Sequence, residues 1–173
     1  MERGYAGQQG KRRGMMMENY LQVLEESLHK KKDVLCRIET ANNKQEEILR
    51  QIPVSDEDFD QSIEEKGALI DELNKLDEGF ENLYEHIKEQ LSAGKEKYKV
   101  QIASLQRLIT EVTDKSVSIQ AQEARNKQLA EHFFINSRKE LQREQRSSKA
   151  ALDYYKSMSQ SQVVAPQFMD QKK

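Results

Sequence analysis

The fold is decided by residues 21–52, which read LQVLEESLHKKKDVLCRIETANNKQEEILRQI. Ten positions spaced three and four residues apart share one side of a helix, and seven of them are apolar. They are Leu21, Leu24, Leu28, Lys31, Leu35, Ile38, Asn42, Gln45, Leu49 and Ile52. Pro53 cannot continue a helix and disfavours helical geometry at the residue before it. The pattern therefore predicts one amphipathic helix over about residues 15–52.

Two more helices are predicted downstream, over about residues 55–91 and 95–146. Ser55 is a suitable N-cap, and the acidic residues 56–58 suit the positive end of a helix. The second helix has a wide apolar stripe from Phe59 to Leu91, and we expect a turn at Gly94 rather than a helix that continues through it. The third helix repeats the same spacing through Ile102, Leu105, Ile109 and Val112. We expect an all-α fold, an elongated antiparallel three-helix coiled-coil bundle whose third helix overhangs its partners from near Phe133.

Both ends of the chain differ in composition from this helical bundle, which we place at residues 15–146. Residues 1–14 contain four of the seven glycines and several basic groups but little to pack, so we expect a disordered arm. The methionines at 15–17 follow directly, and translation starting at one of them is a further hypothesis. Residues 147–173 are expected to form a flexible tail with one short amphipathic segment.

The composition excludes several classes of protein. The 28 basic and 30 acidic side chains alternate along the chain and give a net charge of -2, so no large field exists to attract nucleic acid. No apolar run is long enough for membrane insertion, and one cysteine allows no internal disulfide. We expect a cytoplasmic protein.

Residues suited to chemistry are isolated from one another. The three histidines at 29, 86 and 132 fall one per predicted helix and lack the partner four residues away that a helical metal site needs. Gly94-Lys95 lacks the earlier glycine and the following Ser or Thr of a phosphate-binding loop. We therefore expect no catalytic site, no metal, no cofactor and no enzymatic activity.

Polar residues interrupt each apolar stripe at one common level. Counted from the shared end of the bundle, a lysine of the second helix meets amides and a carboxylate from the other two helices. We predict a polar layer that sets the helix register, made of Asn42, Gln45, Lys66, Glu123 and Asn126. The alternative is that Lys66 extends along its stem to solvent while Glu123 points outward.

Apolar residues near the end of the third helix exceed what the bundle needs. Phe134 and Leu141 are candidates for binding a partner, whereas Leu129 and Phe133 either join them or close the end of the core. In the tail, a short amphipathic element of the kind that docks into a groove on a partner or on the bundle itself contains Leu152, Tyr154 and Tyr155.

Three stretches resemble the flagellar export chaperones of the FlgN type, with FliT as a functional relative. They are IEEKGALIDELNKL at 63–76, QAQEARNKQL at 120–129, and the tyrosines at 154 and 155. The resemblance extends over roughly residues 17–158, and residues 163–173 have no counterpart in it. It implies a chaperone that binds the C-terminal helical segment of hook-filament junction or cap subunits, prevents premature polymerisation and delivers them to the type III export gate.

The resemblance also implies roles for individual residues. The cargo surface would lie at Phe134, Leu141 and their neighbours, and Tyr154 or Tyr155 would help docking at the export apparatus. Such a chaperone is expected to be a monomer or a weak dimer. The alternative is a structural coiled-coil scaffold that assembles with itself. A third reading, a nucleic-acid-associated protein that uses the basic arm, predicts salt-sensitive DNA binding.

Overall fold

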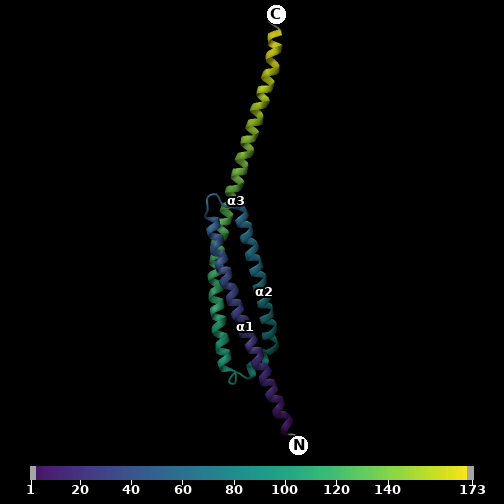
Figure 1. Cartoon of the computed structure of the whole chain (residues 1–173), viewed down its shortest axis with the longest axis vertical. Coiled ribbons are helices and arrows are strands. Elements are labelled where there is room, and N and C mark those ends of the chain that lie inside the picture. Colours follow the sequence, from purple (N-terminus) through teal and green to yellow (C-terminus); the bar gives the residue numbers. More distant parts are fainter. Residues whose placement is uncertain (1–2, 171–173) are drawn as a thin grey trace. The chain divides into compact units, whose positions relative to one another are not determined.

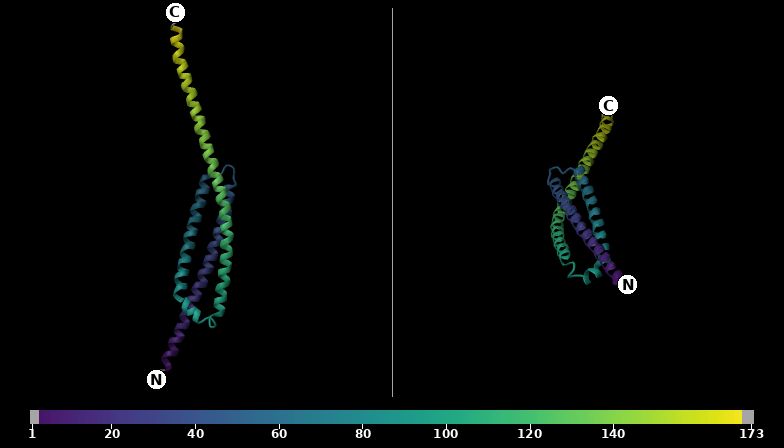
Figure 2. Two further views of the ribbon diagram at one scale, coloured as in Figure 1. Left: turned by 180° about the vertical axis from the view of Figure 1, so that it is seen from behind. Right: turned by 60° about the horizontal axis from the view of Figure 1, so that its bottom comes forward.

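The computed structural model describes residues 3–170, with side chains described for residues 7–157. The helices are α1 (Arg3–Leu49), α2 (Asp56–Ala93) and α3 (Lys99–Asp170), and no strand occurs among the described residues. The chain divides into two units, residues 1–129 and 130–173. Within the first unit, α1, α2 and the first part of α3 lie side by side, as Figures 1 and 2 show from three directions. The all-α three-helix fold predicted from the sequence is confirmed.

Sequence separations between bonded residues define the direction of each helix. The sequence separation between bonded residues of α1 and α2 decreases along the bundle, so these two helices are antiparallel. The separation is 46 for Lys31 with Asp77, 35 for Arg37 with Glu72, and 17 for Gln45 with Ser62. Pairs between α1 and α3 stay within a narrow range of sequence separations, from 76 for Glu39 with Lys115 to 84 for Asn42 with Asn126, so these helices are parallel. Three of the pairs are 79 positions apart: Glu25 with Ser104, Lys32 with Glu111, and Asn43 with Gln122. The first unit is therefore an up-down-up bundle.

Two apolar clusters follow one another along this bundle. One lies near the turn between α2 and α3 and consists of Met17, Leu21, Leu24, Leu28, Ile87, Tyr98, Leu105 and Leu108. The other lies in the middle and consists of Val34, Leu35, Ile38, Val112 and Ile119. Burial of these side chains is the main force that holds the helices together, because it removes their apolar surface from water.

The break between α1 and α2 lies close to the expected position. Ser55 caps α2, since its hydroxyl accepts a 3.2 Å hydrogen bond from the backbone N–H of Asp58. The first helix stops at Leu49 instead of Ile52, and the side chain of Ile52 is 99% exposed, so Ile52 is not part of the core stripe. The cause is Pro53, which disfavours helical backbone before it.

The break at Gly94 is present in the structure. Gly94 ends α2 by donating its N–H to the Gln90 carbonyl, and α3 begins at Lys99 rather than at residue 95. Between them Tyr98 turns its ring into the core, where a Cβ on Gly94 would lie only 3.1 Å from that ring. Glycine is thus the residue that lets the tyrosine close this end of the bundle.

The helices extend into both terminal segments. Residues 3–14, predicted to be disordered, are helical in α1, and residues 147–170, predicted to be a flexible tail, are helical in α3. Each residue added to an existing helix fixes only its own backbone for one further hydrogen bond, so a helix propagates readily beyond its packed part. The Gln, Arg, Lys and Ala residues of these segments have good helix propensity.

Candidate functional site

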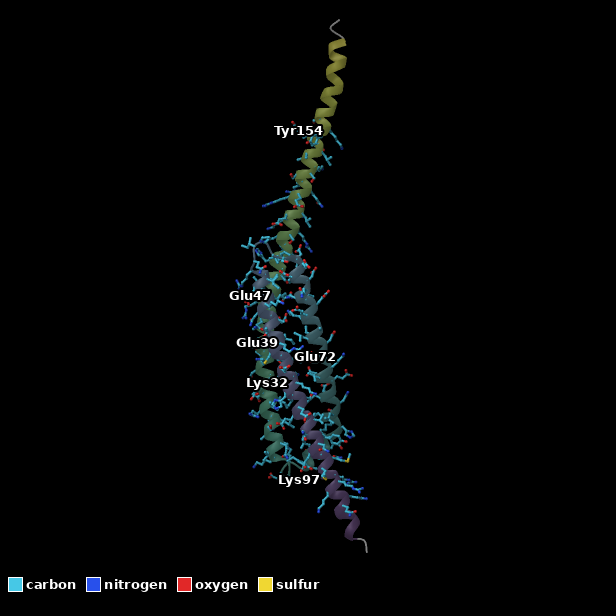
Figure 3. All side chains as sticks on the ribbon, in the orientation of Figure 1. Lys32, Glu39, Glu47, Glu72, Lys97 and Tyr154 are labelled. Carbon is cyan, nitrogen blue, oxygen red and sulfur yellow. The ribbon has the colours of Figure 1, made fainter. Side chains whose placement is uncertain are left out.

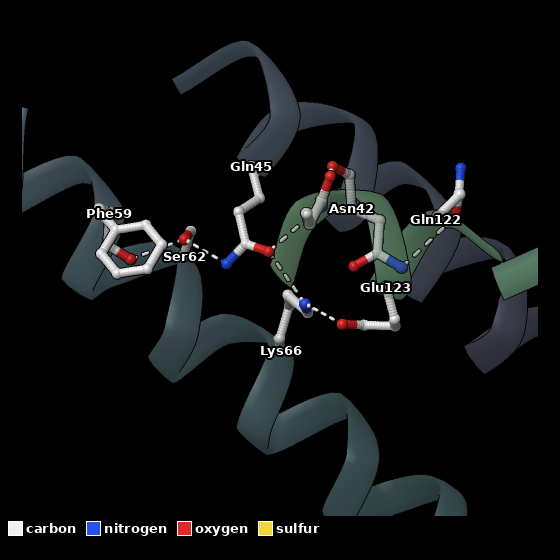
Figure 4. A network of polar contacts seen from close by, with 8 residues as sticks. Asn42, Gln45, Phe59, Ser62, Lys66, Gln122 and Glu123 are labelled. Carbon is white, nitrogen blue, oxygen red and sulfur yellow. Dashed lines mark hydrogen bonds and ion pairs between the residues drawn. The ribbon is translucent and has the colours of Figure 1, made fainter. Parts of the chain in front are cut away.

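The predicted polar layer is present in the structure, as Figure 4 shows. The Lys66 ammonium of α2 donates to Gln45 Oε1 of α1 at 3.0 Å and lies 2.8 Å from the Glu123 carboxylate of α3. Asn126 Nδ2 donates to the Asn42 backbone carbonyl at 2.9 Å and to Gln45 Oε1 at 3.2 Å. The structure thus brings together all five residues expected in the layer. The alternative, in which Lys66 and Glu123 point separately to solvent, is wrong.

Burial explains why these contacts matter. Lys66 is 7% exposed, so its ammonium has little access to water and depends on the two oxygens that face it. The carboxylate of Glu123 is more than one-third exposed, so it remains hydrated while it pairs with the lysine. Asn42 and Asn126 are nearly fully buried, and a side-chain oxygen of each has no hydrogen-bond partner among the described residues. Burial of these two oxygens therefore costs free energy of folding. Such a layer is better suited to specifying the helix register than to maximising stability.

The layer also contains three residues besides the five named in the prediction: Ser62, Asn43 and Gln122. Ser62 accepts from Gln45 Nε2 at 3.0 Å and donates to the Phe59 carbonyl, while Gln122 donates to Asn43 Oδ1 at 2.9 Å. Ser62 precedes Lys66 by one helical turn, so the signal was available as a second polar position on the same face of α2.

Two apolar residues predicted to bind a partner are exposed on the part of α3 in the second unit. Phe134 is 49% exposed and Leu141 is 57% exposed. Phe133 is half-buried, and its ring centroid lies 5.4 Å from that of Phe134. Leu129 belongs to the first unit and is half-buried. Phe134 and Leu141 are therefore the residues of this set most accessible to a partner.

The side chains predicted for docking lie further along the second unit. Leu152, Tyr154 and Tyr155 are all exposed, and the two tyrosine rings meet edge to face with centroids 5.9 Å apart. Tyr154 is labelled in Figure 3. We call Phe134, Leu141, Leu152, Tyr154 and Tyr155 the exposed α3 residues.

A groove between α2 and α3 in the first unit was not predicted. Near the Gly94 turn it has a volume of about 600 Å³ and is lined by Tyr84 and Leu91 of α2 and by Ile102 of α3. One turn further along the bundle, a second hollow of about 180 Å³ is lined by Phe80 and Ile109, with Leu28 of α1 also in its lining. The rings of Phe80 and Tyr84 stack with centroids 6.4 Å apart, which links the two hollows along α2.

The groove is related to a difference between the predicted and the observed core residues of α3. On α3 the sequence pattern predicted Ile109 in the core, but Leu108 is 1% exposed and Ile109 is 43% exposed. A step of three residues from Leu105 reaches Leu108 and a step of four reaches Ile109, and both steps fit a helix. The available signal was the adjacent apolar pair, which makes the stripe wider than one interface needs.

Ion pairs cover the outer faces of the bundle, where Lys32, Glu39 and Glu72 are labelled in Figure 3. The hydrogen bond from Lys32 lowers the pKa of the Glu111 carboxyl, and the bond to Glu39 raises the pKa of the Lys115 ammonium. These groups are solvated, so the pairs select orientation more than they add stability.

Two further features bear on the kind of site. Among the described residues, no group of three or more His, Cys, Asp and Glu side chains is placed to hold a metal ion. In the part of the chain that the structure describes, no helix contains an apolar stretch long enough to cross a membrane.

The fold and its surfaces define an all-α three-helix bundle with a buried polar layer, an apolar groove and exposed apolar residues on α3. Comparison of the chain with protein-family models, with curated proteins and with solved structures finds no match.

Proposed function

We propose that this protein is a cytoplasmic export chaperone that binds the helical C-terminal segment of flagellar hook-filament junction or cap subunits. It keeps them from polymerising early and delivers them to the type III export gate. The observation that carries the proposal is the exposure of large apolar side chains on α3, above all Phe134 and Leu141. Large apolar groups in contact with water favour association with an apolar partner surface.

The mode of binding follows from the character of this surface. Phe134 and Leu141 are seven residues apart, which places them two turns apart on nearly the same side of α3. An amphipathic helix binds such a stripe through apolar residues at matching intervals. A partner helix would then cover the stripe as the neighbouring helix does in a coiled coil. No cofactor is required for this binding.

The resemblance of residues 63–76, 120–129 and 154–155 to the FlgN and FliT chaperones supports the choice of cargo. The same resemblance assigns Tyr154 and Tyr155 to docking at the export apparatus. Their position on α3, 13 and 14 residues beyond Leu141, separates the docking residues from the cargo residues along the helix. One chaperone can therefore bind its cargo and the gate at the same time.

The test measures binding of the full-length chain to the C-terminal segment of a junction or cap subunit by isothermal titration calorimetry. We expect one-to-one binding, and at least a tenfold loss of affinity in the double variant Phe134→Glu, Leu141→Glu. The matched control is Val117→Glu, since the Val117 side chain is also exposed but lies on the part of α3 in the first unit, so its replacement should leave the affinity unchanged.

The oligomeric state of the same purified protein distinguishes the chaperone proposal from the alternative of a self-assembling scaffold. Light scattering after size-exclusion chromatography should give a monomer or a weak dimer without cargo. A stable higher oligomer that does not bind junction or cap segments would overturn the proposal in favour of the scaffold.

The docking residues need a separate measurement. The variant Tyr154→Ala, Tyr155→Ala should keep its cargo affinity within about twofold and lose binding to the cytoplasmic domain of the export gate. Loss of cargo binding in this variant would contradict the separation of the two roles.

A further inference from the structure

The groove between α2 and α3 has a charged end that the proposed function does not use. Lys88, Lys95 and Lys99 line it near the Gly94 turn, against one acidic lining residue, Glu96. Lys88 is held by Glu85 of its own helix at 2.6 Å. Lys95 and Lys99 have no ion-pair partner among the described residues. The free positive charge of the groove therefore lies at the turn.

The start of α3 adds to this positive charge. A helix carries partial positive charge at its N-terminus, where the first amide N–H groups lack partners within the helix. At α2 that end is matched by Asp56, Glu57 and Asp58, whereas α3 has no acidic residue in its first turn and begins with Lys99. A lysine at this end is unfavourable for the helix itself. A carboxylate supplied by another molecule would relieve the unfavourable charge.

The rest of the groove is elongated and has a row of apolar side chains, with polar residues such as Gln106 and Thr113 beside them. Beyond the turn it is lined by Tyr84 and Phe80 on α2 and by Ile102 and Ile109 on α3. On α3 the two hollows follow one another, and their linings together extend from Lys99 to Thr113, which is ~21 Å at the 1.5 Å rise of a helix. A helix of about fourteen residues has this length, so four turns with one apolar stripe fill the groove.

We propose that this groove binds one amphipathic helix of a partner protein, about four turns long, with acidic residues at the end that lies beside Lys95 and Lys99. The bound helix becomes the fourth helix of the bundle. Its apolar stripe covers Phe80, Tyr84 and Ile109, and its carboxylates pair with the turn lysines. This surface is distinct from the exposed α3 residues, and the inference does not depend on the proposed function.

The test uses designed fourteen-residue helical peptides and the full-length chain. Two peptides carry leucines at helical spacing and glutamates at either the first or the last turn, and two matched peptides carry lysines instead of the glutamates. Fluorescence anisotropy should show saturable binding of a glutamate peptide, at least tenfold tighter than binding of its lysine counterpart. Methyl spectra of isoleucine-labelled protein should report the site, with shifts at Ile102 and Ile109 and none at Ile48.

Two charge variants make the experiment specific. Replacement of the exposed lysines 95 and 99 by Glu should weaken binding of the glutamate peptide at least tenfold and favour the lysine peptide. Replacement of the exposed lysines 30 and 75 by Glu changes the net charge equally and should alter binding less than twofold. Circular dichroism on both variants checks that they remain helical.

Several outcomes would overturn the proposal. They are no saturable binding by either glutamate peptide, equal binding by the two charge variants, and isoleucine shifts outside the groove. Dimerisation of the chain that is lost in Ile109→Glu would assign the groove to a second copy. Tighter peptide binding by the variant Leu152→Glu, Tyr155→Glu would assign it to the chain's own C-terminal segment. None of these results depends on cargo binding at Phe134 and Leu141, so the two proposals fail separately.

Discussion

Replacement of Gln45 by Leu tests whether the polar layer acts as one connected unit. Gln45 is 2% exposed, and its amide bonds to three side chains: the Lys66 ammonium, the Asn126 amide and the Ser62 hydroxyl. Each of these keeps one other partner, namely Glu123, the Asn42 carbonyl and the Phe59 carbonyl. The loss is therefore three hydrogen bonds without a fully isolated group, which costs ~3 kcal/mol at about 1 kcal/mol per bond.

Lys66→Met supplies the comparison. Gln45 then keeps Asn126 and Ser62, Glu123 keeps its access to water, and Met fills the space with apolar atoms. Removing one partner of an ion pair is costly when the other charge stays buried, but the Glu123 side chain is 40% exposed, so we expect a loss of about 1 kcal/mol or less. In the double variant the bond between the two residues is already absent, so its cost falls below the sum of the single costs by ~1 kcal/mol.

The assay is equilibrium unfolding in urea followed by far-ultraviolet circular dichroism, with Gln128→Leu as an exposed amide control on α3. The slope with denaturant should stay constant, so that a shift of midpoint reports stability. A loss below about 1 kcal/mol for Gln45→Leu, or strict additivity in the double variant, would refute the connected layer.

Three other predictions concern the rest of the bundle. The pKa of Glu111 lies below its ordinary value of 4.5 because Lys32 donates to the carboxylate, so its contribution to stability is complete above that pH and is lost as the pH falls. Lys32→Met should raise the pKa of Glu111 toward its ordinary value in an NMR titration. Leu24→Ala empties a fully buried position and should cost ~3 kcal/mol in urea unfolding. Ser55→Ala removes the cap of α2 and should cost ~1 kcal/mol, measured in the same way.

Each of these has an outcome that contradicts it. An unchanged Glu111 pKa in Lys32→Met would mean that the ion pair is not formed in solution. Val23→Ala, at an exposed α1 position, is the control for Leu24→Ala, and equal losses in the two variants would contradict the assigned helix face. For the cap, Ser55→Asp should retain stability because a carboxylate also accepts from the Asp58 amide.

The sequence pattern was sufficient for the three packed helices, for the breaks between them and for five residues of the polar layer, but not for the helical ends at residues 3–14 and 147–170. The breaks at Pro53 and Gly94 have local causes, because proline restricts the backbone dihedral angles and glycine widens their allowed range whatever the rest of the chain does. The level shared by Lys66, Gln45 and Glu123 follows from helix length alone once the helices reverse at those breaks.

Which individual side chains are buried depends on packing between the helices. Whether Leu108 or Ile109 enters the core is decided by the neighbouring helices, since the helix repeat permits both. The buried Tyr98 lies in a turn, where no periodic pattern marks a core residue. The α2–α3 groove follows from these choices, so it could not be placed from the sequence.

The narrow range of sequence separations between bonded residues of α1 and α3, from 76 to 84, limits how this chain can change its length during evolution. A residue inserted within α1 would rotate every later side chain of that helix by about 100° and move Lys32, Asn43 and their partners off one another. Insertions are tolerated in the two turns, at residues 50–55 and 94–98, or as whole heptads gained in all three helices at the same level. Related chains should therefore differ in length by multiples of seven within the helices and by any number at the turns.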